Sequence, residues 1–299
     1  MTFVPGPVVV TVPATSANLG PGFDALGLAL ELRDSLEGSV VARGLSVSVQ
    51  GEGAADVPLD ETHLVVRAMH ATFHELGASP PGLELVCRNA IPHARGLGSS
   101  AAAIVGGVVL ARGLVPGGAE TLPDDAAFRL AARLEGHPDN VAPALYGGLT
   151  VSGRDDGVFF TARVPVSSSI RAVAFLPPTP LSTEVARGLL PGTVPHADAA
   201  ANSGRAALLV AALAGQPGLL LTATDDFLHQ SYRRPAMPDS LDLVQRLRAD
   251  GHAAVVSGAG PTVLVLLADD TDLASYTPAG WRHHPLGVAA DGAAVASAG

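Results

Sequence analysis

Hydrophobic positions recur with two different periods along the chain, so both strands and helices are predicted. The β-branched run at 8–12 is typical of a buried strand, and alternating apolar positions at 40–49 and 83–87 indicate further antiparallel strands. The stretch 14–22 is rich in Asn, Gly, Ser and Pro, and we expect a loop there.

Helical spacing is found in several other stretches. Residues 64–76 place apolar side chains near one face, and residues 124–135 do so between Asp124 as the expected N-cap and Gly136 as the stop. Residues 101–110 are apolar almost all round, which is typical of a buried helix. Further helices are expected at 203–214 and 241–250, and further strands at 253–256 and 263–267. This mixture predicts an α+β fold in two layers, which we divide into an N-terminal domain at 1–164 and a C-terminal domain at 165–299.

A glycine-rich segment, IPHARGLGSSAA at 91–102, joins a predicted strand to the buried helix. Gly96 and Gly98 let backbone N–H groups approach a ligand because no Cβ is in the way. The helix start presents unpaired amides and a partial positive charge to an anion, and Ser99 and Ser100 add hydroxyl groups. The segment is therefore a candidate phosphate site, the alternative being that Ser99 merely caps a helix after an ordinary glycine turn.

Two acidic residues stand out by their positions. Glu135 ends its predicted helix, where the helix dipole disfavours a carboxylate, so it is a candidate ligand for Mg²⁺ together with Ser99; the alternative is a solvated glutamate. Asp24 precedes the apolar run 25–30 and is either a cap or a contact for an amine or hydroxyl. A glycine turn at 257–262 closes a hairpin or brings backbone near the phosphates, and it lacks the full dinucleotide fingerprint.

The absence of Lys narrows the kind of phosphate site. All 18 residues counted as Lys or Arg are Arg. A Walker A loop, a protein-kinase fold and Schiff-base chemistry each require a Lys, so these classes are excluded. If the protein handles ATP, backbone amides, Arg and a metal must hold its phosphates.

Charge and cysteine content set the expected compartment and partners. A net charge of −10 argues against nucleic acid as a partner, and the lone Cys87 argues against a disulfide framework or a zinc site. No basic segment follows Met1, and apolar runs such as 263–268 are too short to span a membrane. We therefore expect a cytoplasmic protein that binds neither nucleic acid nor membrane.

Taken together, the motifs resemble the GHMP kinases, and within that family the homoserine kinases. The resemblance spans nearly the whole chain and rests on PATSANLGPGFD at 13–24, GLGSS at 96–100, HPDNVAP at 137–143, STEVAR at 182–187, SYR at 231–233 and SGAGPT at 257–262. It implies a two-domain GHMP kinase fold, with an N-terminal domain like domain 2 of ribosomal protein S5, a ferredoxin-like C-terminal domain, and the active site between them.

The resemblance also implies ATP as co-substrate, Mg²⁺ as cofactor and L-homoserine as acceptor. Ser99 and Glu135 would bind the metal, and Asn18, Asp24, His137 and Asn140 would face homoserine, whose carboxylate Thr183, Arg187 and Arg233 would hold. The loop that would wrap the ATP phosphates consists of Pro92, His93, Ala94, Arg95, Gly96, Leu97, Gly98, Ser99, Ser100, Ala101 and Ala102.

This resemblance leaves three points to settle, namely the catalytic groups, the nucleotide preference and the oligomeric state. Several family members use an Asp as base where Asn140 stands here, so we expect Asn140 and Asp24 to act catalytically by orienting the hydroxyl. The family usually has Asn near the adenine where this chain has His63, which leaves the nucleotide preference open. Oligomeric state is also open, a homodimer being one candidate. The rival hypotheses are a GHMP kinase acting on another small hydroxylated metabolite and a descendant that binds ligands without turnover.

Overall fold

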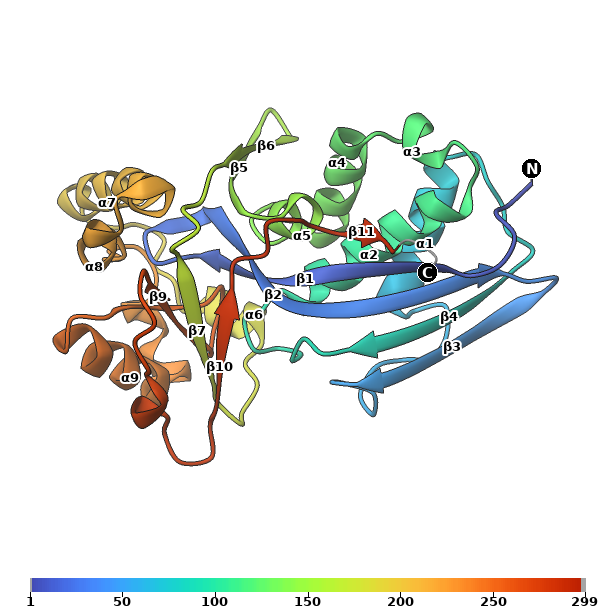
Figure 1. Cartoon of the computed structure of the whole chain (residues 1–299). Coiled ribbons are helices and arrows are strands. Elements are labelled where there is room, and N and C mark those ends of the chain that lie inside the picture. Colours follow the sequence, from blue (N-terminus) through green and yellow to red (C-terminus); the bar gives the residue numbers. More distant parts are fainter. Residues whose placement is uncertain (1, 297–299) are drawn as a thin grey trace.

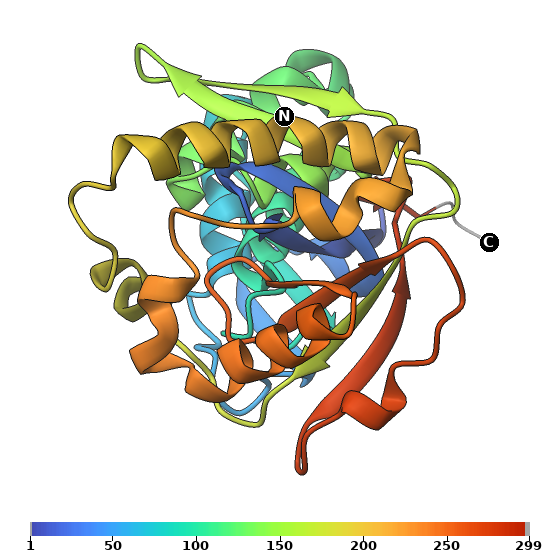
Figure 2. The same ribbon diagram turned by 90° about the vertical axis from the view of Figure 1, so that its left-hand side faces the viewer.

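The structure is a computed structural model that describes residues 2–296, and it contains two β-sheets with helices packed on them (Figures 1 and 2). The larger sheet has the order β11-β1-β2-β4-β3, with β5 also paired to β2 and β6 paired to β5. The smaller sheet has the order β10-β7-β9-β8 and is antiparallel throughout.

The elements of the first half are β1 (Val8–Asn18), β2 (Gly22–Val40), β3 (Gly44–Gly51), α1 (Leu64–Glu75), β4 (Gly82–Asn89), α2 (Ser99–Leu114), α3 (Gly118–Thr121), α4 (Asp124–Glu135), α5 (Val141–Tyr146), β5 (Leu149–Asp155) and β6 (Val158–Val164). Those of the second half are β7 (Arg171–Leu176), α6 (Thr183–Gly188), α7 (His196–Gly215), α8 (Leu220–Ala223), α9 (Pro238–Ala249), β8 (Ala253–Val256), β9 (Val263–Leu267), β10 (Arg282–Gly287) and β11 (Ala294–Val295), with short 3-10 helices at Pro217–Leu219, Ser231–Ala236 and Ala274–Tyr276.

The predicted helices and the α+β fold are confirmed, and three local predictions are wrong. Residues 14–18 are not a loop, because β1 continues through Pro13 and pairs with β2 as far as Asn18, with register shifts at Pro13/Ala14 and Ala17/Asn18. β3 pairs with β4 in parallel, since α1 carries the chain back between them. Asp124 is the first residue of α4, and Pro123 is its N-cap.

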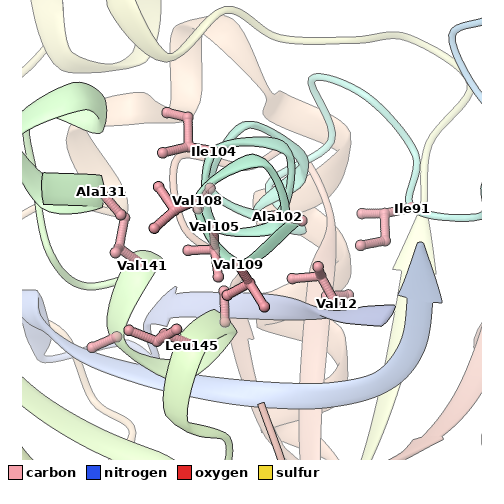
Figure 3. Packing of buried hydrophobic residues seen from close by; sticks show 14 of the residues in the cluster. Val12, Ile91, Ala102, Ile104, Val105, Val108, Val109, Ala131, Val141 and Leu145 are labelled. Atoms are coloured by element: carbon pink, nitrogen blue, oxygen red, sulfur yellow. The ribbon is translucent and has the colours of Figure 1, made fainter. Parts of the chain in front are cut away.

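Helix α2 is the centre of the core. Ile104, Val105 and Val108 are almost fully buried in it, and Figure 3 shows Val105 on the side of the helix toward the strands and Ile104 on the opposite side. Gly106 lets the helix lie directly on the sheet, because a Cβ there would come within 2.3 Å of the Leu36 side chain. The apolar pattern on every side of α2 therefore reflects burial on every side.

The division of the chain at residue 164 stays a prediction. The strands of the two sheets separate between Val164 and Arg171, but β11 returns to pair with β1, and Val288 bridges to Leu30. Val288 and the residues of β11 are therefore anchored on the first sheet. Within residues 2–296, no helix is both long and apolar enough to cross a membrane.

Asp34 joins strand β2 to the start of the glycine loop. Its Oδ1 accepts hydrogen bonds from the backbone N–H groups of Ala90 (2.7 Å) and Ile91 (2.9 Å), although the residue is only 5% exposed. Burial raises the pKa of this carboxyl to about 6, against the two hydrogen bonds, which lower it. The ionised group is therefore less stable in the folded protein than in the unfolded chain.

We expect Asp34→Asn to stabilise the protein at pH 8 and not at pH 4. An amide oxygen can still accept both backbone hydrogen bonds. In the wild type, the free energy of unfolding falls by about 3 kcal/mol as the pH rises from the pKa of Asp34 in the unfolded chain through its folded-state pKa of about 6, and the substitution removes this loss. Urea unfolding at pH 4, 6 and 8 measures this, with the exposed Asp270→Asn as the control. A difference in unfolding free energy that does not change with pH would contradict the assignment.

Candidate active site

The glycine loop turns sharply into α2. Gly96 (φ +76°) and Gly98 (φ +70°) have left-handed backbone conformations, and so does Ala94 (φ +51°). Gly98 is the N-cap of α2, Ser99 is its first helical residue, and no side chain among residues 2–296 caps the helix, so the alternative in which Ser99 is only a cap is wrong. The first helical hydrogen bond runs from Ala102 N to Gly98 O, which leaves the preceding amides available to an anion.

Three segments far apart in the sequence meet at this loop. Thr15 N donates to Leu97 O (3.0 Å), and Gly258 N donates to Ala17 O (3.0 Å). The Ser257 hydroxyl donates to Gly96 O (2.6 Å) and lies 2.8 Å from the Ser16 hydroxyl. We call this arrangement of residues 15–18, 95–98 and 257–260 the three-segment junction.

A cavity of about 370 Å³ lies beside the junction, and residues from both halves of the chain line it. It is lined by Ala17, Asn18, Ala94, Gly96, Gly98, Ser99, Ser100, Glu135, His137, Asp139, Asn140, Leu181, Ser182, Thr183, Arg187, Arg233, Gly258 and Ala259. The structure thus brings together most of the residues singled out in the sequence, from segments as distant as Asn18 and Arg233.

The remaining predicted residues lie around the cavity. Asp24 pairs with Arg187, which lines it. The Arg95 guanidinium is engaged by the carbonyls of Pro177 and Pro178. His93 and Ala102 line a second, neighbouring cavity. Three residues of the predicted loop are buried and do not line the first cavity, namely Pro92, Leu97 and Ala101.

At one end of the cavity, a carboxylate faces the start of α2. The Ser100 hydroxyl donates to Glu135 Oε1 (2.5 Å), and burial raises the pKa of Glu135 above its usual value. Within residues 2–296, there is no group of three or more His, Cys, Asp or Glu side chains that could coordinate a metal ion. One carboxylate and the hydroxyls of Ser99 and Ser100 nevertheless fit Mg²⁺, which takes one or two carboxylates with phosphate and water oxygens.

Asn140 is held in a fixed orientation beside the glycine loop. The Thr15 hydroxyl donates to Asn140 Oδ1 (2.8 Å), which leaves the amide NH₂ as a donor toward the cavity. A Cβ on Gly98 would lie 1.9 Å from Thr15 Oγ1 and 3.1 Å from Asn140 Oδ1. The glycine is therefore required for this pair as well as for the turn.

His137 carries a positive charge more readily than an ordinary histidine. Its Nδ1 lies 3.1 Å from Oδ1 of Asp139, a buried carboxylate, and this hydrogen bond raises the pKa of His137 against the effect of burial. An imidazolium is a donor and not a base.

Arg187 and Asp24 form a two-pronged ion pair across the two halves of the chain. The Nη1–Oδ2 distance is 3.0 Å and the Nη2–Oδ1 distance is 2.7 Å, and the hydrogen bond to Asp24 raises the pKa of Arg187. Asp24 itself has φ +53°, held in part by a hydrogen bond from its N–H to Asn18 Oδ1. Asn18 also donates to Gly258 O (2.8 Å), so its amide serves the framework of the cavity wall.

Sequence reasoning missed four side chains that support the cavity, namely Thr15, Phe23, Asp139 and His229. Thr15, Phe23 and Asp139 lie inside motifs that were singled out for their neighbours. His229 lies four residues before Arg233, a spacing of about one helical turn. This spacing is the one feature of the sequence that could have suggested a contact between the two side chains.

A second cavity of about 250 Å³ adjoins the first through Ser99 and Ser100. Its wall is largely apolar, with Leu36, Val65 and Cys87 among the lining residues. His63 lines it and is 5% exposed; its Nδ1 has no hydrogen-bond partner among the described residues, and burial lowers the pKa of the ring. The two cavities together provide an apolar compartment and a polar compartment on either side of the start of α2.

Comparison with models of known protein families identifies the broad class of protein to which the chain belongs. The GHMP kinases N terminal domain model matches residues 63–148, and the GHMP kinases C terminal model matches residues 208–275. The L. major mevalonate kinase structure has the same fold, with a TM-score of 0.67 at 16% identity over 96% of this chain and 97% of that one.

More similar relatives define the branch. Homoserine kinases of Streptomyces coelicolor (55% identical over 96% of this chain and 94% of theirs) and Streptomyces avermitilis (54%, 96% and 95%) are among them. The homoserine kinase structure from Cytophaga hutchinsonii has a TM-score of 0.84 at 25% identity, covering 97% of both chains. A putative homoserine kinase from Listeria monocytogenes has a TM-score of 0.76 at 32% identity, covering 98% of this chain and all of that one. The chain belongs to the homoserine kinase branch of the GHMP kinase family, and its fold is the two-domain GHMP kinase fold.

We expect Gly96→Ala to destabilise the protein and weaken nucleotide binding. A Cβ at this left-handed position would lie 2.2 Å from Ser257 O and 3.0 Å from Gly260 O, so the junction must open. The expected cost is at least about 2 kcal/mol of unfolding free energy, with at least about tenfold weaker binding of Mg-ATP in calorimetry.

The matched control is Gly204→Ala in α7, where no atom would lie within 4 Å of the new Cβ. This variant should gain about 0.5–1 kcal/mol and bind nucleotide as the wild type does. If the two variants behaved alike, the junction would not constrain the loop.

Proposed function

We propose that this chain transfers the γ-phosphoryl group of ATP to the side-chain hydroxyl of L-homoserine, giving O-phospho-L-homoserine, a step of threonine biosynthesis. One observation carries the proposal: a single cavity is lined both by the lysine-free glycine loop and by Arg187, whose charge is paired with that of Asp24, as expected of an amino-acid site. The membership of the chain in the homoserine kinase branch supports the same acceptor.

The phosphate half of the site rests on backbone groups. Unpaired amides at the start of α2 and the hydroxyls of Ser99 and Ser100 can surround phosphate oxygens without an ammonium group. The second cavity, on the other side of these serines, is apolar enough for a purine base. Mg²⁺ bound by Ser99 and Glu135 would neutralise charge on the phosphate oxygens.

The acceptor half suits a zwitterion. Arg187 and Arg233 can donate planar pairs of hydrogen bonds to a carboxylate, while Asp24 can accept from an ammonium group. An α-amino acid presents both charges, so it can replace the Arg187–Asp24 contact with one partner for each residue. Thr183 and Ser182 add hydroxyls at the start of α6.

Catalysis in this proposal is positioning and charge stabilisation. Asn140 cannot accept a proton, and the raised pKa of His137 favours its protonated form, which is a hydrogen-bond donor. Asn140 and Asp24 orient the acceptor, and His137 offers positive charge to developing negative charge. A loose phosphoryl-transfer transition state builds little charge on the nucleophile, so a strong base is not required.

An ADP-release assay tests the acceptor. We expect Mg-ATP turnover with L-homoserine, and turnover that is at least about a hundredfold lower in kcat/KM with L-mevalonate or galactose. Two truncated acceptors sharpen the test: 3-amino-1-propanol lacks the carboxylate and 4-hydroxybutyrate lacks the ammonium group, and each should lose at least about tenfold. Equal turnover of homoserine and mevalonate would favour a GHMP kinase with another substrate, and no turnover of any acceptor would favour a binding protein.

Arg187→Ala and Asn140→Ala should separate acceptor binding from positioning. Loss of the guanidinium removes carboxylate hydrogen bonds, so the KM for homoserine should rise about 10–100-fold with kcat within about threefold. Loss of the Asn140 amide should instead lower kcat about 10–100-fold with little change in KM. Steady-state kinetics on both variants decide the matter, and identical profiles would count against the assigned roles.

Localisation in the cytoplasm and a homodimeric assembly stay predictions. Gel filtration with light scattering would measure the assembly directly.

A further inference from the structure

The two cavity arginines differ in what holds them. Arg187 is paired with the Asp24 carboxylate through both of its terminal nitrogens. Arg233 is 1% exposed, yet no carboxylate within residues 2–296 lies within salt-bridge distance of it. Its Nη1 donates to Gly258 O (3.0 Å) and to His229 Nδ1 (3.1 Å), and its Nε has no hydrogen-bond partner in the part of the chain that the structure describes.

The contact with His229 fixes the state of that imidazole. His229 is fully buried, and its Nε2 lies 2.7 Å from Gly20 O, a carbonyl that can only accept. The hydrogen therefore sits on Nε2, and Nδ1 is left as a neutral acceptor for Arg233. Burial lowers the pKa of His229, which agrees with an uncharged ring.

The carboxylate of Asp226, three residues before His229, is not within salt-bridge distance of the Arg233 guanidinium. Asp226 accepts hydrogen bonds from the backbone N–H groups of Leu228, His229 and Gln230, and its Oδ1 lies 3.5 Å from His229 Nε2, on the far side of the ring. Phe23 forms the remaining wall: its ring centroid is 5.7 Å from the guanidinium carbons of both Arg187 and Arg233 and 5.1 Å from the His229 ring. Both hydrogen-bond partners of Arg233 among residues 2–296 are thus uncharged.

We propose that His229 is a positioning residue which fixes Arg233 through a neutral acceptor, so that the positive charge of Arg233 stays available for the carboxylate of the acceptor. This inference rests on the proposed function, because it takes the acceptor to carry a carboxylate. A buried guanidinium with a carboxylate partner of its own would bind a second carboxylate more weakly. A guanidinium anchored by an imidazole nitrogen and a carbonyl has the same fixed geometry, and its charge is not neutralised by a hydrogen-bonded carboxylate.

The test is a pair of variants that differ in charge and hardly in shape. Asn at position 229 can place its Oδ1 where Nδ1 lies, and Asp places a carboxylate oxygen at the same point. We expect His229→Asn to keep the KM for homoserine within about threefold of wild type, and His229→Asp to raise it at least about tenfold. In both variants kcat and the KM for Mg-ATP should stay within about threefold of wild type.

Several controls keep the result decisive. Thermal melting shows whether each variant is folded, and the same Asn and Asp pair at the exposed His74 should leave every constant unchanged. If His229→Asp does not fold, His229→Gln serves instead: it can keep the donor toward Gly20 O but loses the acceptor at Nδ1, and its KM for homoserine should rise at least about fivefold.

The outcomes separate this inference from the proposed function. Turnover of homoserine by the wild type, with equal KM values in the Asn and Asp variants, would overturn the role of His229 and leave the activity intact. An unchanged KM in the Gln variant would do the same. Wild-type protein that does not turn over homoserine would overturn both.

Discussion

The three-segment junction is the constraint on which the candidate active site depends. Residues 15–18, 95–98 and 257–260 come from the first strand, the glycine loop and the turn between β8 and β9. They are joined by two backbone hydrogen bonds and by the Ser257 hydroxyl, which donates to Gly96 O. Any Cβ on Gly96 would push the Ser257 carbonyl away. Because the same turn accepts from Asn18 and Arg233 at Gly258 O, the junction also sets the distance between the phosphate loop and the acceptor groups.

The site binds anions through local positive groups, although the chain as a whole is negatively charged. A chain with a net charge of −10 must bind a polyanion through local features, since its overall field repels one. The amides of α2 supply partial positive charge without desolvating an ammonium group. The buried Arg233 keeps a pKa of about 10 despite desolvation and is therefore still charged at neutral pH. Burial raises the pKa of Glu135, and a nearby cation would stabilise its ionised form.

Local patterns predicted the framework well and the long-range contacts poorly. The apolar helix α2 and the glycine loop before it were evident from composition and spacing, because burial on all sides and left-handed glycines leave direct signatures. Polar residues at 14–18 indicated a loop, yet Thr15 and Ser16 are buried in a strand since their hydroxyls find partners at Asn140 and Ser257. Such partners lie more than a hundred residues away, and periodicity carries no information about them.

The same limit explains why two arginines from similar-looking helical segments have different states. Arg187 and Arg233 each follow a short polar stretch, and the sequence gives both as carboxylate ligands by resemblance. Their difference arises from tertiary contacts, since β2 brings Asp24 to one and the turn at Gly258 brings a carbonyl to the other. Both guanidinium carbons lie 5.7 Å from the centroid of the Phe23 ring, and the site is asymmetric because, within residues 2–296, Asp24 forms an ion pair with Arg187 and no carboxylate forms one with Arg233. An acceptor that carries an ammonium and a carboxylate group matches that asymmetry, because it can satisfy Asp24 while adding the anion that Arg233 lacks.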